Sequence, residues 1–192
     1  SGVESNYLVN QSQQVMALEH LADAAGVPTL VAPVLLGPSS NFEQTLEIGK
    51  GTSSGVGPGM PVEDADGLVG SVVLAGKSTA TVELLTDARS SVDVRFGVSG
   101  VAGISVLQGE GPGRPLAATL SDSSLAGAPL RRGEPVITSG LAAADYPAGI
   151  PVGTVASVSS ASGGLAEQVA VTPFATPQEL QYVAVMLWTP TA

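Results

Sequence analysis

Glycine and proline interrupt this chain so often beyond residue 28 that few regular elements there can be long. There are 24 Gly and 14 Pro among 192 residues, and they separate short runs rich in Val, Leu and Ile. Short β-branched runs bounded by Gly, Pro, Asp or Ser are typical of strands joined by turns. The pattern predicts about eleven strands, at residues 30–36, 44–48, 68–74, 79–85, 92–96, 103–107, 116–120, 136–138, 154–158, 168–172 and 182–188.

The order of these runs favours antiparallel sheets, because amphipathic helices, which would connect parallel strands, do not separate them. Within residues 92–96 the apolar side chains alternate with Asp93 and Arg95, as in a strand with one face on a core and the other in water. We therefore expect two small antiparallel barrels or sandwiches. Residues 108–115 and 157–164 are so rich in Gly, Pro or Ser that we expect loops there.

A different pattern precedes the strands. Residues 4–25 contain neither Gly nor Pro, and Gly26 and Pro28 follow where a helix would end. Apolar residues recur at heptad spacing along this predicted helix. The seam consists of Leu8, Val15, Leu18 and Leu21. It fits equally well the end of a longer coiled coil and a single amphipathic helix that packs on a neighbouring domain.

Charge and composition exclude several classes of function. Seventeen acidic residues outnumber seven basic ones, so the net charge of −10 repels nucleic acid. The absence of cysteine removes thiol nucleophiles, disulfides and thiolate metal sites. The most apolar stretch, residues 27–36, contains two prolines and is shorter than the roughly 20 residues that span a bilayer. No signal peptide opens the sequence, so for an exported protein we expect the targeting segment upstream.

Candidate catalytic and metal-binding residues are few. Ser139 lies in a Thr-Ser-Gly turn without the Gly-x-Ser-x-Gly pattern, and the only histidine, His20, falls within the predicted helix. Glu63, Asp64 and Asp66 cluster before Gly67, but they lack the further ligands of a calcium loop and fit a hairpin turn. We therefore predict no catalytic residue, metal or cofactor. A trypsin-like hydrolase and a calcium-dependent secreted adhesion module stay as alternatives.

Glycine and turn positions across the chain resemble the rod shape-determining MreC family. The similarity is carried by separate segments in the family's order. They are residues 48–51 (IGKG), 55–56 (GV), 59–62 (GMPV), 66–72 (DGLVGSV), 82–87 (VELLTD), 132–141 (RGEPVITSGL), 146–155 (YPAGIPVGTV), 171–173 (VTP) and 182–185 (YVAV). Glu134, Pro135 and Tyr146 depart from the family's more frequent residues, although the spacing is kept.

The resemblance implies a fold and a domain organisation. It implies a coiled-coil remnant at residues 1–27 and two small β-barrels arranged as in a chymotrypsin-type protease without its triad. We expect the first barrel at residues 28–90, completed by 178–190, and the second at 91–177. Five glycines would permit the turns and close strand crossings. They are Gly67, Gly70, Gly140, Gly149 and Gly153.

The resemblance also implies a function. It indicates a non-enzymatic scaffold of the bacterial cell elongation machinery, which helps to organise peptidoglycan synthesis. The implied partners are a second copy of the chain, the membrane protein MreD and a penicillin-binding transpeptidase. The implied location is outside the cytoplasmic membrane, with a transmembrane anchor upstream of these residues.

Overall fold

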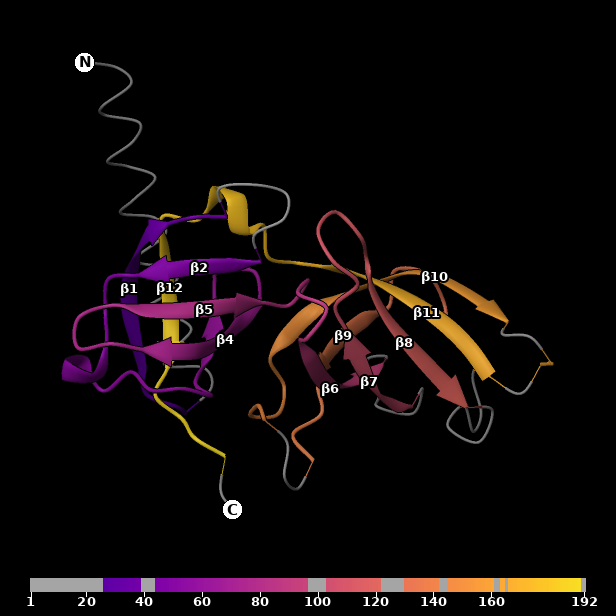
Figure 1. The fold of residues 1–192 in the computed structure, drawn as a ribbon. Helices are drawn as coiled ribbons and strands as arrows, with labels where there is room; N and C mark the ends of the chain where they lie inside the picture. Colours follow the sequence, from indigo (N-terminus) through magenta and orange to yellow (C-terminus); the bar gives the residue numbers. More distant parts are fainter. Residues whose placement is uncertain are drawn as a thin grey trace.

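The computed structural model describes residues 26–38, 44–96, 103–121, 130–141, 145–160, 163–164 and 166–190. These residues form twelve β-strands, short 3-10 turns and no α-helix. The strands build two closed antiparallel barrels of six strands each, which lie side by side (Figure 1). The prediction of a mainly β chain with two small barrels is confirmed. Residues 1–25 of the helix predicted at residues 1–27 lie outside the described residues.

The first barrel combines strands from both ends of the described chain. Its strands are β1 (Thr29–Leu36), β2 (Thr45–Ile48), β3 (Pro61–Glu63), β4 (Leu68–Ala75), β5 (Ala80–Leu84) and β12 (Tyr182–Met186). Their order around the barrel is β1-β12-β3-β4-β5-β2. β12 thus fills the position between β1 and β3, where Val31 pairs with Ala184 and Val62 with Val185. A 3-10 turn, η1 (Thr52–Ser54), lies between β2 and β3.

The second barrel is continuous in sequence. Its strands are β6 (Ser91–Phe96), β7 (Ile104–Gln108), β8 (Leu116–Ser121), β9 (Pro135–Thr138), β10 (Pro151–Ser160) and β11 (Ala166–Pro173), in the order β10-β11-β8-β7-β6-β9. The connection from β11 back to the first barrel contains η3 (Pro177–Glu179). The alternation at residues 92–96 is realised, because Val92, Val94 and Phe96 are buried in the barrel core.

Each barrel has its own core. Residues that include Leu46, Ile48, Val72 and Val82 fill the first barrel. The core of the second barrel also takes in three residues from the first, which are described below. Alternating side chains of antiparallel strands point to opposite faces, so the apolar positions of each short run meet inside a barrel.

Two details of the predicted strands are wrong. β3 was not predicted, because three residues that begin with proline are too short to show a period, yet β3 pairs with both β12 and β4. The loop predicted at residues 157–164 overlaps the strand predicted at 154–158, and the strand in fact continues further: residues 157–160 extend β10 and pair with β11 as far as Ser160 opposite Glu167. Serine is tolerated there because β11 provides backbone hydrogen-bond partners for this part of β10 and because these serines face solvent.

Four of the five glycines belong to a single barrel, where they stand at close contacts or at turns with positive φ. A Cβ on Gly70 would overlap the carbonyl oxygen of Glu83, and one on Gly153 would overlap that of Thr172. Gly140 and Gly149 have φ of 61° and 86°, in the left-handed region that favours glycine. The fifth, Gly67, lies between the barrels.

Candidate functional site

The two barrels meet at an apolar joint. Leu68, Leu85 and Met186 belong to the first barrel or follow it directly, but they are buried within the core cluster of the second. Burying an aliphatic side chain of this size stabilises a fold by about 1.5–3 kcal/mol. The joint therefore contributes to the stability of both barrels.

Backbone and side chains also approach closely across the joint. A Cβ on Gly67, in the turn before β4, would lie 2.5 Å from the carbonyl oxygen of Pro151 and 3.4 Å from Cβ of Phe174. Tyr146 of the second barrel is buried and makes a side-chain hydrogen bond with Ser71 in β4. Burial raises the pKa of Tyr146, and the hydrogen bond with Ser71 opposes that rise. The close approach of Gly67 to Pro151 leaves no room for a larger residue at position 67.

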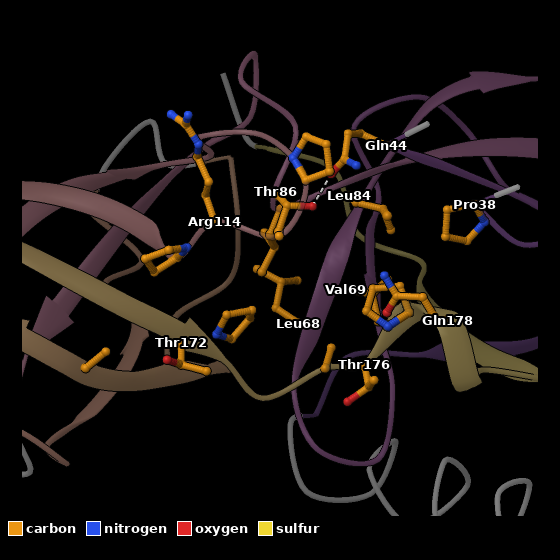
Figure 2. Close-up of a pocket in the computed structure, with 18 residues that line it drawn as sticks. Pro38, Gln44, Leu68, Val69, Leu84, Thr86, Arg114, Thr172, Thr176 and Gln178 are labelled. Carbon is orange, nitrogen blue, oxygen red and sulfur yellow. Dashed lines mark hydrogen bonds between the residues drawn. The ribbon is translucent and has the colours of Figure 1, made fainter. Parts of the chain in front are cut away.

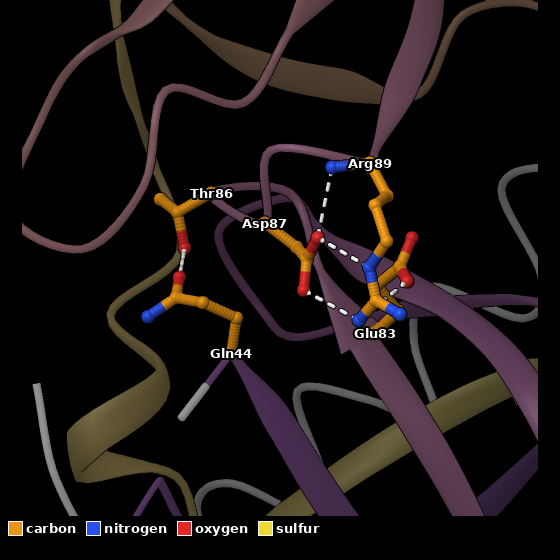
Figure 3. A network of polar contacts seen from close by, with 5 residues as sticks. All are labelled: Gln44, Glu83, Thr86, Asp87 and Arg89. Carbon is orange, nitrogen blue, oxygen red and sulfur yellow. Dashed lines mark hydrogen bonds and ion pairs between the residues drawn. The ribbon is translucent and has the colours of Figure 1, made fainter. Parts of the chain in front are cut away.

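The turn after β5 is joined to the loop after β7. The Gly111 N–H donates to the Thr86 carbonyl oxygen at 2.9 Å, and Thr86 Oγ1 donates to Gln44 Oε1 (Figure 3). Gly109 packs so closely that an added Cβ would lie 2.6 Å from the carbonyl oxygen of Leu85. Gly109 is consequently buried, although we expected residues 108–115 to form an exposed loop.

An ion pair fixes the same turn. The Asp87 carboxylate accepts hydrogen bonds from the Arg89 backbone N–H at 2.8 Å, from Nε at 3.0 Å and from Nη2 at 2.9 Å (Figure 3). Arg89 Nη2 also lies 3.5 Å from Glu83 Oε2. The hydrogen bonds from Arg89 lower the pKa of Asp87. Because Arg89 is largely exposed, the pair orders the turn more than it stabilises the whole fold.

These contacts border a groove of about 670 Å³ between the barrels (Figure 2). Its apolar lining includes Leu68, Val69, Leu84 and Leu85 from the first barrel. Five prolines, Pro38, Pro112, Pro115, Pro173 and Pro177, also line it. Its polar lining consists of Gln44, Thr86, Arg114, Thr172, Thr176 and Gln178. Concave, mainly apolar spaces at domain interfaces with a few polar groups are the usual form of a binding site.

The acidic cluster forms a turn. Asp64 Oδ1 accepts the backbone N–H groups of Asp66 at 2.7 Å and Gly67 at 2.8 Å. Glu63 is buried, and burial, followed by the nearby charge of Asp64, raises its pKa to about 7. Burial also raises the pKa of Asp64, against those backbone hydrogen bonds. In the part of the chain that the structure describes, no group of three or more His, Cys, Asp or Glu could hold a metal ion.

Ser139 is buried at the end of β9. Its N–H donates to the Asp93 carbonyl oxygen, and its own carbonyl oxygen accepts from Arg95 Nη2 at 3.2 Å. Among the described residues its Oγ has no hydrogen-bond partner, and His20 lies outside them. A serine nucleophile needs a hydrogen-bonded base, and the described residues provide no such contact to Ser139 Oγ.

The predicted self-association seam also lies outside the described residues. Leu8, Val15, Leu18 and Leu21 all precede residue 26. No helix in the described ranges is long and apolar enough to cross a membrane.

Comparison with known proteins identifies the barrel pair. Residues 34–187, which include nearly all of both barrels, match the family model for the rod shape-determining protein MreC, barrel core. The chain belongs to the MreC family. The cell shape-determining protein MreC of Listeria monocytogenes is 34% identical over 165 residues, covering 82% of this chain and 52% of the relative. MreC of Haemophilus influenzae is 31% identical, covering 82% and 43%. The chain thus spans about half the length of the curated relatives it matches.

Solved structures share the fold of this MreC-family chain. One MreC structure superposes with a TM-score of 0.82 at 32% identity, covering 93% of this chain and 98% of the other. A structure of a complex between penicillin-binding protein PBP2 and MreC from Helicobacter pylori matches with a TM-score of 0.55 at 16% identity, covering 83% and 99%. The second likeness shows the fold alone.

Sequence reasoning did not find the groove. Its walls come from residues far apart in the chain, such as Leu68, Arg114 and Thr172. Their proximity depends on how the barrels pack, which no local motif encodes. The one available signal was the density of proline and glycine at residues 109–115, which we interpreted only as a loop.

Proposed function

We propose that this chain is the extracytoplasmic scaffold portion of an MreC protein, which organises cell-wall synthesis during elongation of a rod-shaped bacterium. The observation that carries the proposal is the family match over residues 34–187. The curated relatives are named for cell shape, and a pair of closely joined barrels suits a protein that holds others in place. Peptidoglycan synthesis, the process it would organise, takes place outside the cytoplasmic membrane.

The proposed action is binding without catalysis. The buried hydroxyl of Ser139 supports this, as does the turn that Asp64 forms in place of a metal-ligand cluster. We further propose that the barrels are arranged as in a chymotrypsin-type protease that lacks the triad. The proposed domains are residues 28–90, completed by 178–190, and residues 91–177.

A penicillin-binding transpeptidase is the proposed enzyme partner. The proposal draws on the complex of PBP2 with MreC from Helicobacter pylori, whose MreC shares this fold. We also propose an interaction with MreD and attachment to the membrane by an anchor upstream of these residues. Membership of the family supports both proposals.

Self-association through the N-terminal seam completes the proposal. Leu8 and Val15 are seven residues apart, and Leu18 and Leu21 follow at steps of three. This spacing supports the proposal, since such seams pair helices. Sedimentation over a range of concentrations would compare a form extended at its N-terminus with a Val15→Asp, Leu18→Asp variant. We expect a dimer that the double substitution dissociates. A monomer at every concentration would remove the seam from the mechanism.

The partner is tested by titration calorimetry between this chain and the extracytoplasmic part of a penicillin-binding transpeptidase from the same organism. We expect saturable binding of defined stoichiometry. A known interacting pair, measured in the same way, serves as the positive control. If this chain shows no binding at concentrations about 100-fold above those at which the control pair binds, the proposed partner is contradicted.

A further inference from the structure

The groove between the barrels differs in charge from the rest of the chain. Acidic residues exceed basic ones by ten over the whole sequence, yet among the described residues that line the groove none carries a carboxylate and Arg114 alone is charged. Among the described residues, the ion pairs involve only Arg89, so the Arg114 guanidinium has no carboxylate partner there. Arg114 stands at one end of the groove, with Pro38 and Gln178 toward the other (Figure 2). A ligand that matches this lining is apolar and carries a negative charge at one end.

The groove is formed before any ligand arrives. The hydrogen bond from Gly111 to Thr86 joins two of its walls, and the pair of Asp87 with Arg89 fixes the turn that carries Leu85. The prolines on its walls have a fixed φ. A binding site whose walls are already ordered loses little conformational entropy when it is filled.

The shape and polar groups favour an extended protein segment. Hydroxyl and amide side chains are spread along the walls, at Thr86, Thr172, Thr176 and Gln178, where they can pair with successive groups of a peptide backbone. Pro112 and Pro115, which are exposed, and Pro173 and Pro177, which are partly exposed, supply apolar surface for small side chains between those pairs. The walls belong to both barrels, so a segment seated here would contact both.

We propose that the inter-barrel groove binds an extended segment of a partner protein, with small apolar or proline side chains and a carboxylate that pairs with Arg114. The proposal deepens the scaffold function and rests on it for the partner's identity, but binding itself is measured independently of that function. The Arg114 pair selects the segment, while apolar contact with the groove supplies most of the affinity.

The test begins with a random heptapeptide library displayed on phage and selected on the purified chain. We expect enriched peptides that combine apolar or proline residues with Asp or Glu. Synthesised singly, they bind the chain in fluorescence polarisation. Replacing their carboxylate by the amide weakens binding by roughly threefold, as befits a solvent-exposed ion pair, and 0.5 M salt removes the difference.

Two variants locate the binding, each with a matched control. Arg114→Gln is expected to abolish the preference for acid over amide, and Thr172→Trp, an exposed strand position on the groove wall, to weaken binding at least tenfold. Arg131→Gln and Thr119→Trp, at exposed positions outside the groove lining, are expected to change nothing. Thermal melts of all four check that they are folded.

The proposal is overturned if the selection yields no peptide that binds, if enriched peptides lack an acid, or if Thr172→Trp and Thr119→Trp behave alike. Cell-shape complementation separates this failure from that of the scaffold function. If the natural protein restores rod shape while no peptide binds the groove, the groove proposal falls and the scaffold stands. If peptides bind but cells stay round, the groove stands and the scaffold function falls.

Discussion

Gly67→Ala should loosen the joint between the barrels. The added Cβ would lie 2.5 Å from the carbonyl oxygen of Pro151 and 3.2 Å from its carbonyl carbon. Both atoms are backbone in β10, so no side chain can rotate away, and the barrels must separate by about 1 Å to reach an ordinary contact distance. Leu68, the next residue, would lose part of its packing in the second core.

The expected magnitude follows from overpacking. Inserting a methyl group into a close-packed interface costs about 1–3 kcal/mol, so the free energy of unfolding should fall by about 2 kcal/mol. For a chain of this size, that corresponds to a drop in melting temperature of roughly 4–8 °C. Urea denaturation and a thermal melt measure the two quantities on the same samples.

Gly37→Ala is the matched control, because no heavy atom of the described residues lies within 4 Å of its added Cβ and its φ is outside the left-handed region. Its stability should stay within about 0.5 kcal/mol of the wild type. Should Gly67→Ala prove as stable as Gly37→Ala, the close approach of Gly67 to Pro151 is not a constraint, and the reasoning about a tight joint fails.

Three further predictions concern the electrostatics and the joint. The pKa of Glu63, raised from 4.5 to about 7 by burial, means that the folded state keeps a proton which the unfolded state releases. Wild-type stability should therefore fall as pH rises from 5 to 8, by at most about 3 kcal/mol. Urea titrations should show that Glu63→Gln flattens this dependence on pH. Equal wild-type stability at pH 5 and pH 8 would refute the raised pKa of Glu63. Arg89 lowers the pKa of Asp87 below 3.8. Asp87→Asn should therefore reduce the melting temperature at pH 6, and by progressively less as pH falls below 3.8. If the difference in melting temperature between wild type and variant does not depend on pH, the ion pair does not stabilise the fold. Tyr146→Phe should cost about 0.5–1.5 kcal/mol and be non-additive with Ser71→Ala in a double-mutant cycle, whereas simple additivity would show that the two side chains do not interact.

Local pattern was sufficient for most strands but not for β3. The alternation at residues 92–96 and the apolar runs of β4 and β5 each carry their own signal, because a half-buried strand repeats every two residues. β3 has three residues and is buried at all three, so it shows no alternation. It exists because β12 and β4 offer it pairing partners on both sides.

The serine-rich end of β10 shows how pairing overrides composition. Residues 157–160 resemble a loop when taken alone, but β11 pairs with them opposite Ala170, Val169, Gln168 and Glu167. Strand propensity depends on the neighbouring strand more than on the residue itself. Only the topology of the barrel supplies that neighbour.

Site chemistry was predictable where it is local. The turn at Asp64 and Gly67 depends on hydrogen bonds that span two or three residues, and turn propensity encodes such contacts. The groove depends on contacts between positions as distant as Leu68 and Thr172. The burial of Glu63 and Tyr146 likewise follows from packing that only the folded chain displays.

The central claim is that the barrel pair serves cell shape, and replacement in cells tests it most directly. In a rod-shaped bacterium depleted of its own MreC, the natural protein that contains this chain would be produced at the normal level and cell width measured by microscopy. The account predicts rods of normal width, and the same result when Ser139→Ala is introduced, because the proposed action is binding. Round cells, despite folded protein at the normal level and correct location, would contradict it.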